Sequence, residues 1–269
     1  MLLFMKIGIS LSGGGARGIA HLGILQALAE ANIHPDKIVG VSAGSLVGAL
    51  YGQGYSPFEI LEIVKQTNLF RFIRPSFSIK GLLDIRTIAP LLKEYIPHNS
   101  FEGLQRGELV ILTTDIYEGE PQLFSSGKLI PPMLASSAIP VIFNPIEFEG
   151  KTLIDGGVID NLPYTPVADC DFTIGAHINP FHKHVEPSSI RSVLAQSLLL
   201  TIHRNARLNF KKFDVVIEPL ALMPYHVFNL NKADEIFEIG YQHTFKQLPA
   251  ITAAIEEKKQ RLAITQAVS

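Results

Sequence analysis

The chain has 269 residues, enough for one domain with a substantial core, and its formal net charge of −2 gives no bulk attraction to nucleic acid. Its single cysteine, Cys170, excludes an intrachain disulfide and suits a reducing compartment. Hydrophobic residues make up 47% of the chain and charged residues only 18%, a balance that fits either lipid contact or a large buried parallel sheet.

The first five residues are apolar and lead directly into a predicted strand. They lack the basic region and the cleavage site of a signal peptide. No stretch of the sequence approaches the ~20 apolar residues of a membrane-spanning helix. We therefore expect a cytoplasmic protein, with peripheral membrane contact left open and no nucleic-acid partner.

The first predicted strand, Ile7–Leu11, leads into a glycine-rich loop at residues 13–18 and then into a helix. Successive glycines before a helix leave backbone N–H groups free to converge on an anion. The loop also matches the dinucleotide-binding fingerprint, but that motif requires an acidic residue at the end of the second strand. Here the second strand ends in Ser42, Asp36 precedes it, and no Lys-Ser or Lys-Thr closes the loop as in a P-loop. The pattern therefore favours an oxyanion hole.

Ser42 lies in a Gly-Val-Ser-Ala-Gly pentapeptide, between the apolar run 37–39 and a segment of small residues. This is the strand, turn and helix layout of a nucleophile elbow. The elbow holds its serine in a strained backbone conformation, and Gly40 and Gly44 leave room for so sharp a turn. The hydroxyl is then expected at the N-terminus of a helix, whose dipole favours negative charge.

Beyond the elbow, Ser56, Pro57 and Glu59 predict a helix start with a capping box. Further strands are expected at Leu109–Thr113, Gln122–Phe124, Thr152–Ile154, Phe172–Ala176 and Val215–Ile217. Helices are expected at residues 189–210 and 233–247, and a separate charged amphipathic helix is expected to close the chain. The alternation predicts an α/β fold with a mainly parallel central sheet flanked by helices. No repeat or linker divides it, so residues 1–269 are expected to form a single domain.

Residues 69–83 have the composition of an interfacial loop that borders the mouth of the site. Aromatic and aliphatic side chains, including Phe72 and Phe77, are mixed there with the basic residues Arg71, Arg74 and Lys80. A buried connector has a similar composition, so both interpretations stay open. The helical stripe of Arg204, Arg207 and Lys211 is likewise either solvated surface or a membrane contact.

Two further motifs follow, Ala-Ser-Ser-Ala-Ile-Pro at residues 135–140 and Asp-Gly-Gly at residues 155–157. By itself, Asp-Gly-Gly is typical of an ordinary turn. Together with Gly-Gly-Gly-Ala-Arg-Gly and Gly-Val-Ser-Ala-Gly, and in this order, the set resembles the patatin-like phospholipases. The resemblance covers roughly residues 5–180, includes His21, Gly23, Asn161 and Pro163, and is similar in length to small stand-alone bacterial members.

The resemblance implies the three-layer patatin-like architecture and a Ser–Asp dyad that works without a histidine. Ser42 would be the nucleophile, Asp155 the general base, and the oxyanion hole would be formed by the backbone N–H groups around Gly13, Gly14 and Gly15. A free aspartate, with a pKa near 3.9, is a weaker base than a histidine near 6.5. Asp155 must therefore lie close to Ser42 and be partly desolvated.

The activity that the resemblance implies is hydrolysis of phospholipid or lysophospholipid esters through an acyl-enzyme, with no cofactor. A carboxylesterase, a thioesterase or an acyltransferase would use the same dyad, and a non-catalytic lipid-sensing scaffold would retain the fold. His177 is the first alternative base. Headgroup, acyl length and oligomeric state are not specified by the sequence.

Arg17 follows the glycine run and is expected to brace this loop, since a guanidinium has enough donors to hold several carbonyls. Contact with a lipid phosphate is the alternative. None of the nine histidines has the spacing of a zinc site, so no metal is expected. His21 is expected to be structural, and residues 182–184 to form a solvated loop.

Overall fold

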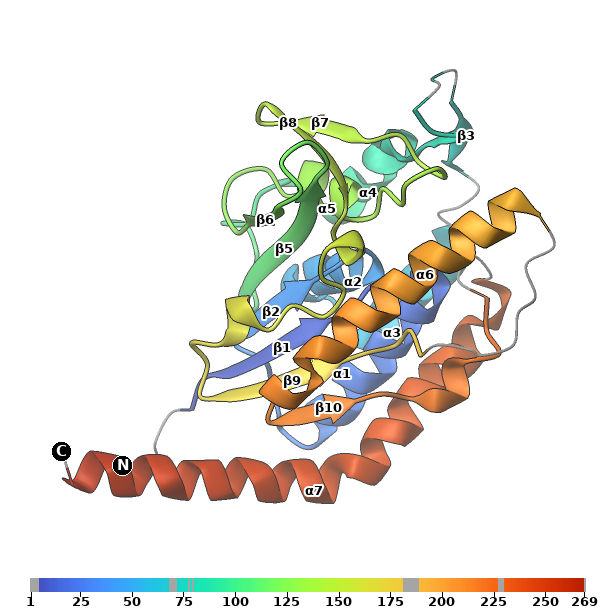
Figure 1. The fold of residues 1–269 in the computed structure, drawn as a ribbon. Coiled ribbons are helices and arrows are strands. Elements are labelled where there is room, and N and C mark those ends of the chain that lie inside the picture. The colour runs from blue at the N-terminus through green and yellow to red at the C-terminus, as the bar shows by residue number, and fades with distance from the viewer. Residues whose placement is uncertain are drawn as a thin grey trace.

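The computed structural model describes residues 5–67, 72–76, 78, 80–180, 189–226 and 230–268. Within these ranges an eight-stranded sheet has the order β10-β9-β1-β2-β5-β8-β7, with β6 paired to β5 (Figure 1). One part of this sheet is parallel and comprises β1 (Ile7–Leu11), β2 (Lys37–Gly40), β9 (Phe172–Ala176), β10 (Val215–Ile217) and the first half of β5 (Glu108–Asp115). The prediction of a mainly parallel α/β sheet is confirmed.

The other part of the sheet is antiparallel and is built around the second half of β5, with β6 on one edge and β8 on the other. It comprises β6 (Pro121–Phe124), β7 (Ile146–Phe148) and β8 (Lys151–Asp155). The strand expected at Thr152–Ile154 is therefore present, but it belongs to a hairpin with β7 and not to the parallel series. The tight turn at Glu149 and Gly150, both with positive φ, joins the two strands of this hairpin.

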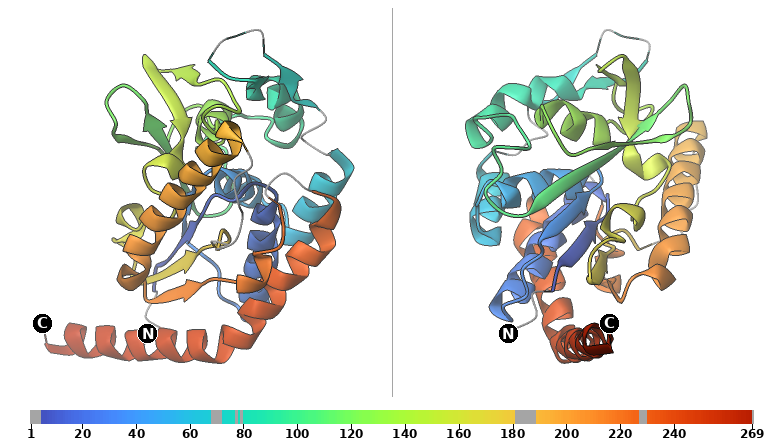
Figure 2. Two further views of the ribbon diagram at one scale, coloured as in Figure 1. Left: turned by 45° about the vertical axis from the view of Figure 1, so that its right-hand side comes forward. Right: turned by 90° about the vertical axis from the view of Figure 1, so that its left-hand side faces the viewer.

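Helices cover both faces of the sheet and make three layers (Figures 1 and 2). They are α1 (Ala20–Glu30), α2 (Ala43–Gly52), α3 (Pro57–Thr67), α4 (Ala89–Tyr95), α5 (Ile130–Ser136), α6 (Ile190–Asn209) and α7 (Ala233–Val268). Short 3₁₀ turns include η1 (Gly15–Ile19), η3 (Ile85–Ile88) and η4 (Gly156–Val158). A small hairpin pairs β3 (Arg74–Pro75) with β4 (Leu83–Asp84).

Successive side chains of the central strands point to opposite faces of the sheet, which divides the hydrophobic core into two clusters. On β2, Ile38 packs into the cluster shared with α1, α2 and α7, whereas Val39 packs into the cluster that includes Ala206 of α6. Neighbouring side chains of a strand point to opposite faces of the sheet, so a continuous apolar run is what a strand covered on both faces requires. α6 therefore lies on one face and α1, α2 and α7 lie on the other (Figure 2).

α1 and α7 approach each other closely because a glycine stands on each side of their contact. A Cβ on Gly23 would lie 2.1 Å from the carbonyl oxygen of Phe237, and a Cβ on Gly240 would lie 2.2 Å from that of Ala20. Any side chain at these positions would force the two helices apart. The first helix of the chain is thus in direct backbone contact with the last one.

The predicted end of the chain is wrong in one respect: α7 is a single helix that continues through Pro249, not two helices. The helix changes direction along its course (Figure 1), as an internal proline causes by removing a hydrogen bond. Ile251 and Ile255 beyond the proline are buried, so packing against the body of the protein outweighs the local break.

The capping box is confirmed, since the Ser56 N–H donates to Glu59 Oε2 (2.7 Å) and the Glu59 N–H donates to Ser56 Oγ (3.3 Å). Every helix within the described ranges is too short or too polar to span a membrane. The expected loop at residues 182–184, Arg71 and Phe77 lie outside the described residues.

Candidate active site

Ser42 stands between the end of β2 and the first residue of α2, in a strained conformation with φ 50° and ψ −121°. A positive φ is unfavourable for any residue with a Cβ, so the surrounding backbone must hold it in place. The two flanking glycines make this turn possible. A Cβ on Gly44 would lie 2.1 Å from the carbonyl oxygen of Leu11, and one on Gly40 would lie 2.6 Å from the Ser45 Cα. This geometry fits the predicted elbow, and the role of Ser42 as nucleophile remains a prediction.

Ser136, at the end of α5, holds the backbone of Ser42 in place. Its hydroxyl accepts a hydrogen bond from the Ser42 N–H (2.8 Å) and donates one to the carbonyl oxygen of Leu112 (2.7 Å). The Ser-Ser-Ala-Ile-Pro motif therefore connects the strained serine to β5. The sequence alone indicates no role for Ser136, because the partners of its hydroxyl are backbone groups far away in the chain.

Asp155 is the last residue of β8, and its carboxyl group is buried. Burial raises the pKa of this carboxyl to about 7, although hydrogen bonds from the Gly157 N–H and the Ser42 side chain act to lower it. The Gly157 N–H donates to Asp155 Oδ1 at 2.8 Å. A carboxylate with such a pKa accepts protons near neutral pH, which an ordinary aspartate does not.

The register of β5 brings the serine and the carboxylate together. Ile111 of β5 pairs with Gly40 on one edge and with β6 on the other, and Thr113 pairs with Asp155 on one edge and with β6 on the other. Since β6 occupies the opposite edge in both cases, β2 and β8 lie on the same edge of β5. β2 and β8 run toward each other along this edge, and their ends meet beside Ile111 and Thr113. Ser42 and Asp155 line a common cavity as a result.

The glycine loop lies against the turn at Ser42, and only some of its backbone N–H groups are available to bind an anion. The Gly13 N–H donates to Asn161 Oδ1 (3.0 Å), and Asn161 Nδ2 donates back to the Gly13 carbonyl oxygen (3.4 Å). That donor is therefore occupied. The N–H groups of Gly14 and Gly15 have no partner in the part of the chain that the structure describes, so the expected oxyanion hole narrows to these two residues. Gly15 has φ 57°, which explains the need for glycine there.

Arg17 projects away from the elbow and contacts only backbone and amide oxygens. Its guanidinium donates to Asn179 Oδ1 (2.6 Å) and to the carbonyl oxygens of Tyr225 (2.7 Å) and Met223 (3.2 Å). These bonds tie the start of α1 to two segments late in the chain. The contacts match those expected of a bracing residue, and that role remains a prediction.

The histidines considered from the sequence lie elsewhere in the core. His177 Nδ1 is 3.1 Å from Glu218 Oε1, and its ring packs against Phe210. Burial lowers the pKa of His177, and the side chain does not line either of the two cavities that contain Ser42. His21 Nε2 is hydrogen-bonded to the carbonyl oxygen of Ser12 (2.8 Å), a structural contact.

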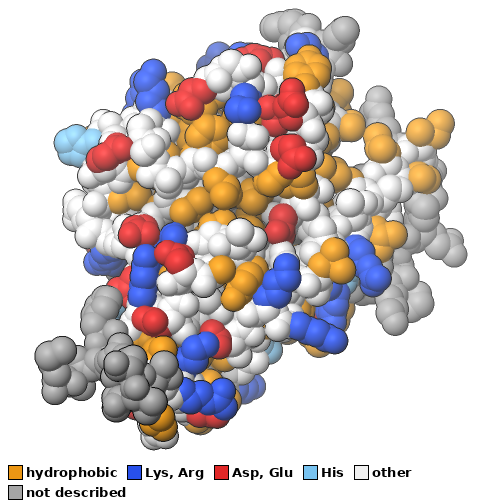
Figure 3. All heavy atoms as spheres, turned by 60° about the vertical axis from the view of Figure 1, so that its left-hand side comes forward, with side chains coloured by type: hydrophobic (Ala, Val, Ile, Leu, Met, Phe, Trp, Pro, Cys, Tyr) orange, Lys and Arg blue, Asp and Glu red, His pale blue; other side chains and the backbone are white. Residues whose placement is uncertain are grey.

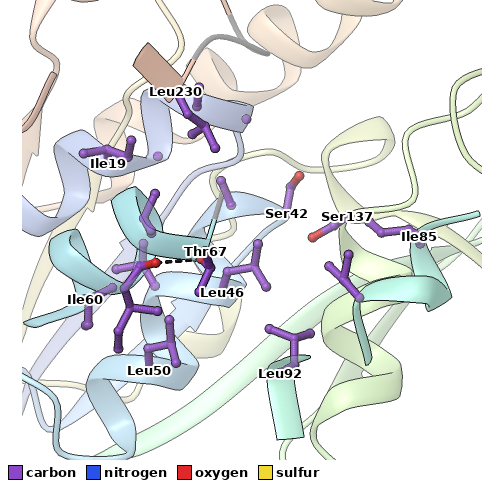
Figure 4. A pocket seen from close by; sticks show the side chains of 18 of the residues that line it. Ile19, Ser42, Leu46, Leu50, Ile60, Thr67, Ile85, Leu92, Ser137 and Leu230 are labelled. Carbon is purple, nitrogen blue, oxygen red and sulfur yellow. Dashed lines mark hydrogen bonds between the residues drawn. The ribbon is translucent and has the colours of Figure 1, made fainter. Parts of the chain in front are cut away.

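Two cavities open from Ser42. The first lies between α2, α3, η3 and α4, and Figure 4 shows the Ser137 side chain directed toward Ser42 across it. The Ser137 hydroxyl is buried and has no hydrogen-bond partner in the described structure. The second cavity lies between the glycine loop, residues 139–142 and α6, and contains Asp155.

The two segments considered for lipid contact differ in position. Ile73 lines the first cavity and Leu82, 57% exposed, lines the second, so the described part of residues 69–83 does border the site. Phe72 is also exposed. Arg207, by contrast, pairs with Glu218 (3.3 Å) and lies over the Phe210 ring. On the face seen in Figure 3, hydrophobic side chains gather in a band, and charges of both signs surround it.

The protein is thus a three-layer α/β protein with a strained serine at a strand–helix turn and a buried carboxyl group in the same cavity. The chain belongs to the patatin-like phospholipase family, whose model matches residues 9–168. The match covers the glycine loop, the elbow, α5 and the Asp-Gly-Gly turn, but ends before β9, α6 and α7.

Relatives agree with this membership. An uncharacterized NTE family protein of Mycobacterium tuberculosis is 33% identical over 179 residues, which cover 65% of this chain and 49% of that protein. Lysophospholipase NTE1 of Kluyveromyces lactis is 27% identical over 282 residues, covering 90% of this chain and 19% of that protein. The chain thus spans half or less of these relatives. The crystal structure of VipD from Legionella pneumophila shares the fold, with a TM-score of 0.55 and 14% identity over 91% of this chain and 67% of VipD.

Proposed function

We propose that this protein is a serine lipid acyl hydrolase that cleaves carboxylic esters of phospholipids or lysophospholipids through Ser42 and Asp155. One observation carries the proposal. A strained serine and a carboxyl group whose pKa burial raises to about 7 line the same cavity, beside two backbone N–H groups with no partner in the described structure. Family membership and the name of the lysophospholipase relative support a lipid ester as the substrate.

In the first half of the reaction, Ser42 Oγ attacks the ester carbonyl carbon while its proton passes to Asp155. The negative charge that develops on the carbonyl oxygen is stabilised by the N–H groups of Gly14 and Gly15. The C–O bond to the alcohol then breaks, and the leaving oxygen takes the proton from Asp155. The product of this half is an acyl-Ser42 ester.

In the second half, water replaces the alcohol on the Asp155 side. Asp155 accepts a proton from the water as it attacks the acyl carbon, and the returning proton restores the Ser42 hydroxyl when the fatty acid leaves. No histidine is required, because desolvation gives the aspartate a basicity close to that of a free imidazole. The enzyme is proposed to act as one catalytic domain, in the cytoplasm, and to meet aggregated lipid at the exposed rim around Phe72 and Leu82.

The experiment combines covalent labelling with product analysis. A fluorophosphonate is expected to add one equivalent at Ser42, and mass spectrometry of a mixed lipid panel is expected to show released fatty acid. Ser42→Ala should abolish both, whereas Ser125→Ala, which changes an exposed serine, should leave both intact. Labelling at another residue, or full turnover by Ser42→Ala, contradicts the proposal. An unlabelled protein would support the non-catalytic scaffold instead.

A further inference from the structure

The two cavities that open from Ser42 differ in the polar groups that line them. The first is lined almost wholly by aliphatic side chains, among them Leu46, Leu50 and Leu92 (Figure 4). Ile63 also lines it. Of its hydroxyl groups, that of Thr67 already donates to the Ile63 carbonyl oxygen (2.6 Å). The second cavity contains Asp155 and the backbone of Gly13 and Gly14. Ser42, Gly15 and Ile139 line both cavities, so the reacting carbonyl must lie where they meet.

Proton transfer decides which half of an ester enters which cavity. Asp155 takes the proton of Ser42 and must return it to the oxygen of the leaving alcohol, so that oxygen must lie on the Asp155 side of the acyl carbon. Asp155 lines the second cavity and is not part of the first. The alcohol half therefore occupies the second cavity, and the acyl chain extends into the first.

The wall of the second cavity that faces the alcohol is apolar. α6 contributes Leu194, Leu198, Leu199 and Ile202, and Val141 and Leu82 approach from the other side. A small polar alcohol such as glycerophosphocholine would leave these side chains in water, whereas a hydrocarbon chain on the alcohol would cover them.

α6 is fixed directly to the turn that carries the base. The Asn205 side-chain amide donates to the carbonyl oxygens of Gly157 (2.9 Å) and Val158 (3.3 Å), and its oxygen accepts from the Asn161 N–H (2.9 Å). Asn161 in turn holds Gly13. The apolar wall thus has a set position relative to Asp155, which a selective subsite requires. α6 lies beyond the region that the family model matches.

We infer that α6 is the specificity element of this enzyme: it selects esters whose leaving alcohol carries a hydrocarbon chain of its own, as in a two-chain lipid, over single-chain lysolipids. The inference rests on the proposed function. It assigns the acyl chain to the cavity between α2 and α4 and the second chain to the groove along α6.

Three substrates with the same hexadecanoyl group test this assignment: dipalmitoyl phosphatidylcholine, 1-palmitoyl lysophosphatidylcholine and p-nitrophenyl palmitate, each in detergent micelles at a fixed surface fraction. The wild type should have its highest kcat/KM on the two-chain lipid. The double variant Leu194→Asn/Leu198→Asn should lower kcat/KM for that lipid by about tenfold or more and change the other two by less than about twofold. Leu200→Asn, on the same helix but not lining the cavity, is the matched control and should change none.

Equal losses on all three substrates, or a wild type that prefers the lysolipid, would overturn the inference. If the double variant fails to fold, Leu198→Phe fills the same groove without adding a polar group, and selective loss of the two-chain substrate is again expected. Ile63→Trp, in the other cavity, should shift the preferred acyl length equally for every alcohol. A wild type that cleaves no ester and takes no fluorophosphonate refutes the proposed function itself, whereas equal cleavage of all three refutes only the role of α6.

Discussion

The ends of β2 and β8 present the two side chains of the proposed dyad in opposite ways. β2 has parallel neighbours on both edges, and its end turns sharply into a helix, which holds Ser42 at φ 50°. β8 has antiparallel neighbours on both edges, and its end enters a 3₁₀ turn with a negative φ at Asp155 (φ −50°, ψ 128°). The serine is thus prepared by backbone strain and the carboxylate by removal from water. One residue carries a conformational penalty and the other an electrostatic one.

The largest effect should come from removing the basic oxygen at the β8 end. Asp155→Asn keeps the shape and the hydrogen bond from Gly157, so the fold should persist while kcat/KM falls by about 100- to 10,000-fold. Steady-state kinetics on a soluble p-nitrophenyl ester, with unfolding followed in parallel, measures this. Asp160→Asn is the control, because Asp160 is also desolvated but bonds Asn209 and the Leu162 N–H outside both cavities.

The same comparison identifies the base unambiguously. Survival of activity in Asp155→Asn together with its loss in His177→Gln would transfer the role of base to the histidine. If Asp155 is the base, kcat/KM of the wild type should rise with pH through a pKa of about 7 and then level off.

A smaller effect concerns stability. The pKa of Asp155 is raised to about 7 in the folded protein, so the folded state holds this proton more tightly than the unfolded chain does. Stability from this group is complete at low pH and is lost as pH rises from about 4 to about 7, by a few kcal/mol at most. Asp155→Asn should therefore unfold at a higher temperature than the wild type at pH 8 and at a similar one near pH 4. An equal difference at both pH values would show that burial does not set the pKa.

The smallest effect tests strain at the β2 end. Ser42→Gly and Ser42→Ala both remove the hydroxyl, but only glycine adopts a positive φ without a steric penalty. Ser42→Gly should be the more stable of the two by about 1–3 kcal/mol in denaturant unfolding, less the entropy that glycine loses on folding. A more stable alanine variant would mean that the elbow is not strained.

Much of the fold and the site could be predicted because the chemistry imposes local patterns. A turn such as that at Ser42 needs flanking glycines, and β9 and β10 are found at the predicted residues because both are short, mainly apolar runs. The glycine loop, the turn at Ser42 and the Asp-Gly-Gly turn can each be recognised from a few consecutive residues.

What could not be predicted depends on distant partners. No local pattern predicts that the Ser136 hydroxyl accepts a hydrogen bond from the Ser42 N–H, or that Asn161 accepts one from the Gly13 N–H. The sequence of β8 likewise does not reveal its antiparallel pairing, since so short a strand fits either kind of neighbour. Nor could the sequence show that the helix predicted at residues 233–247 continues through Pro249, because burial of the residues after the proline is a tertiary effect.

The backbone contact between α1 and α7 has a consequence for how the molecule is made. β1 pairs with β9, and the helix that follows the glycine loop rests on Gly240, so residues near both ends of the chain must be present together. Contacts between such distant residues form slowly, because closing a long loop costs conformational entropy before the contacts can stabilise the fold. During synthesis, the segment bearing Ser42 leaves the ribosome early, yet its glycine loop gains its final support only after the last helix has emerged.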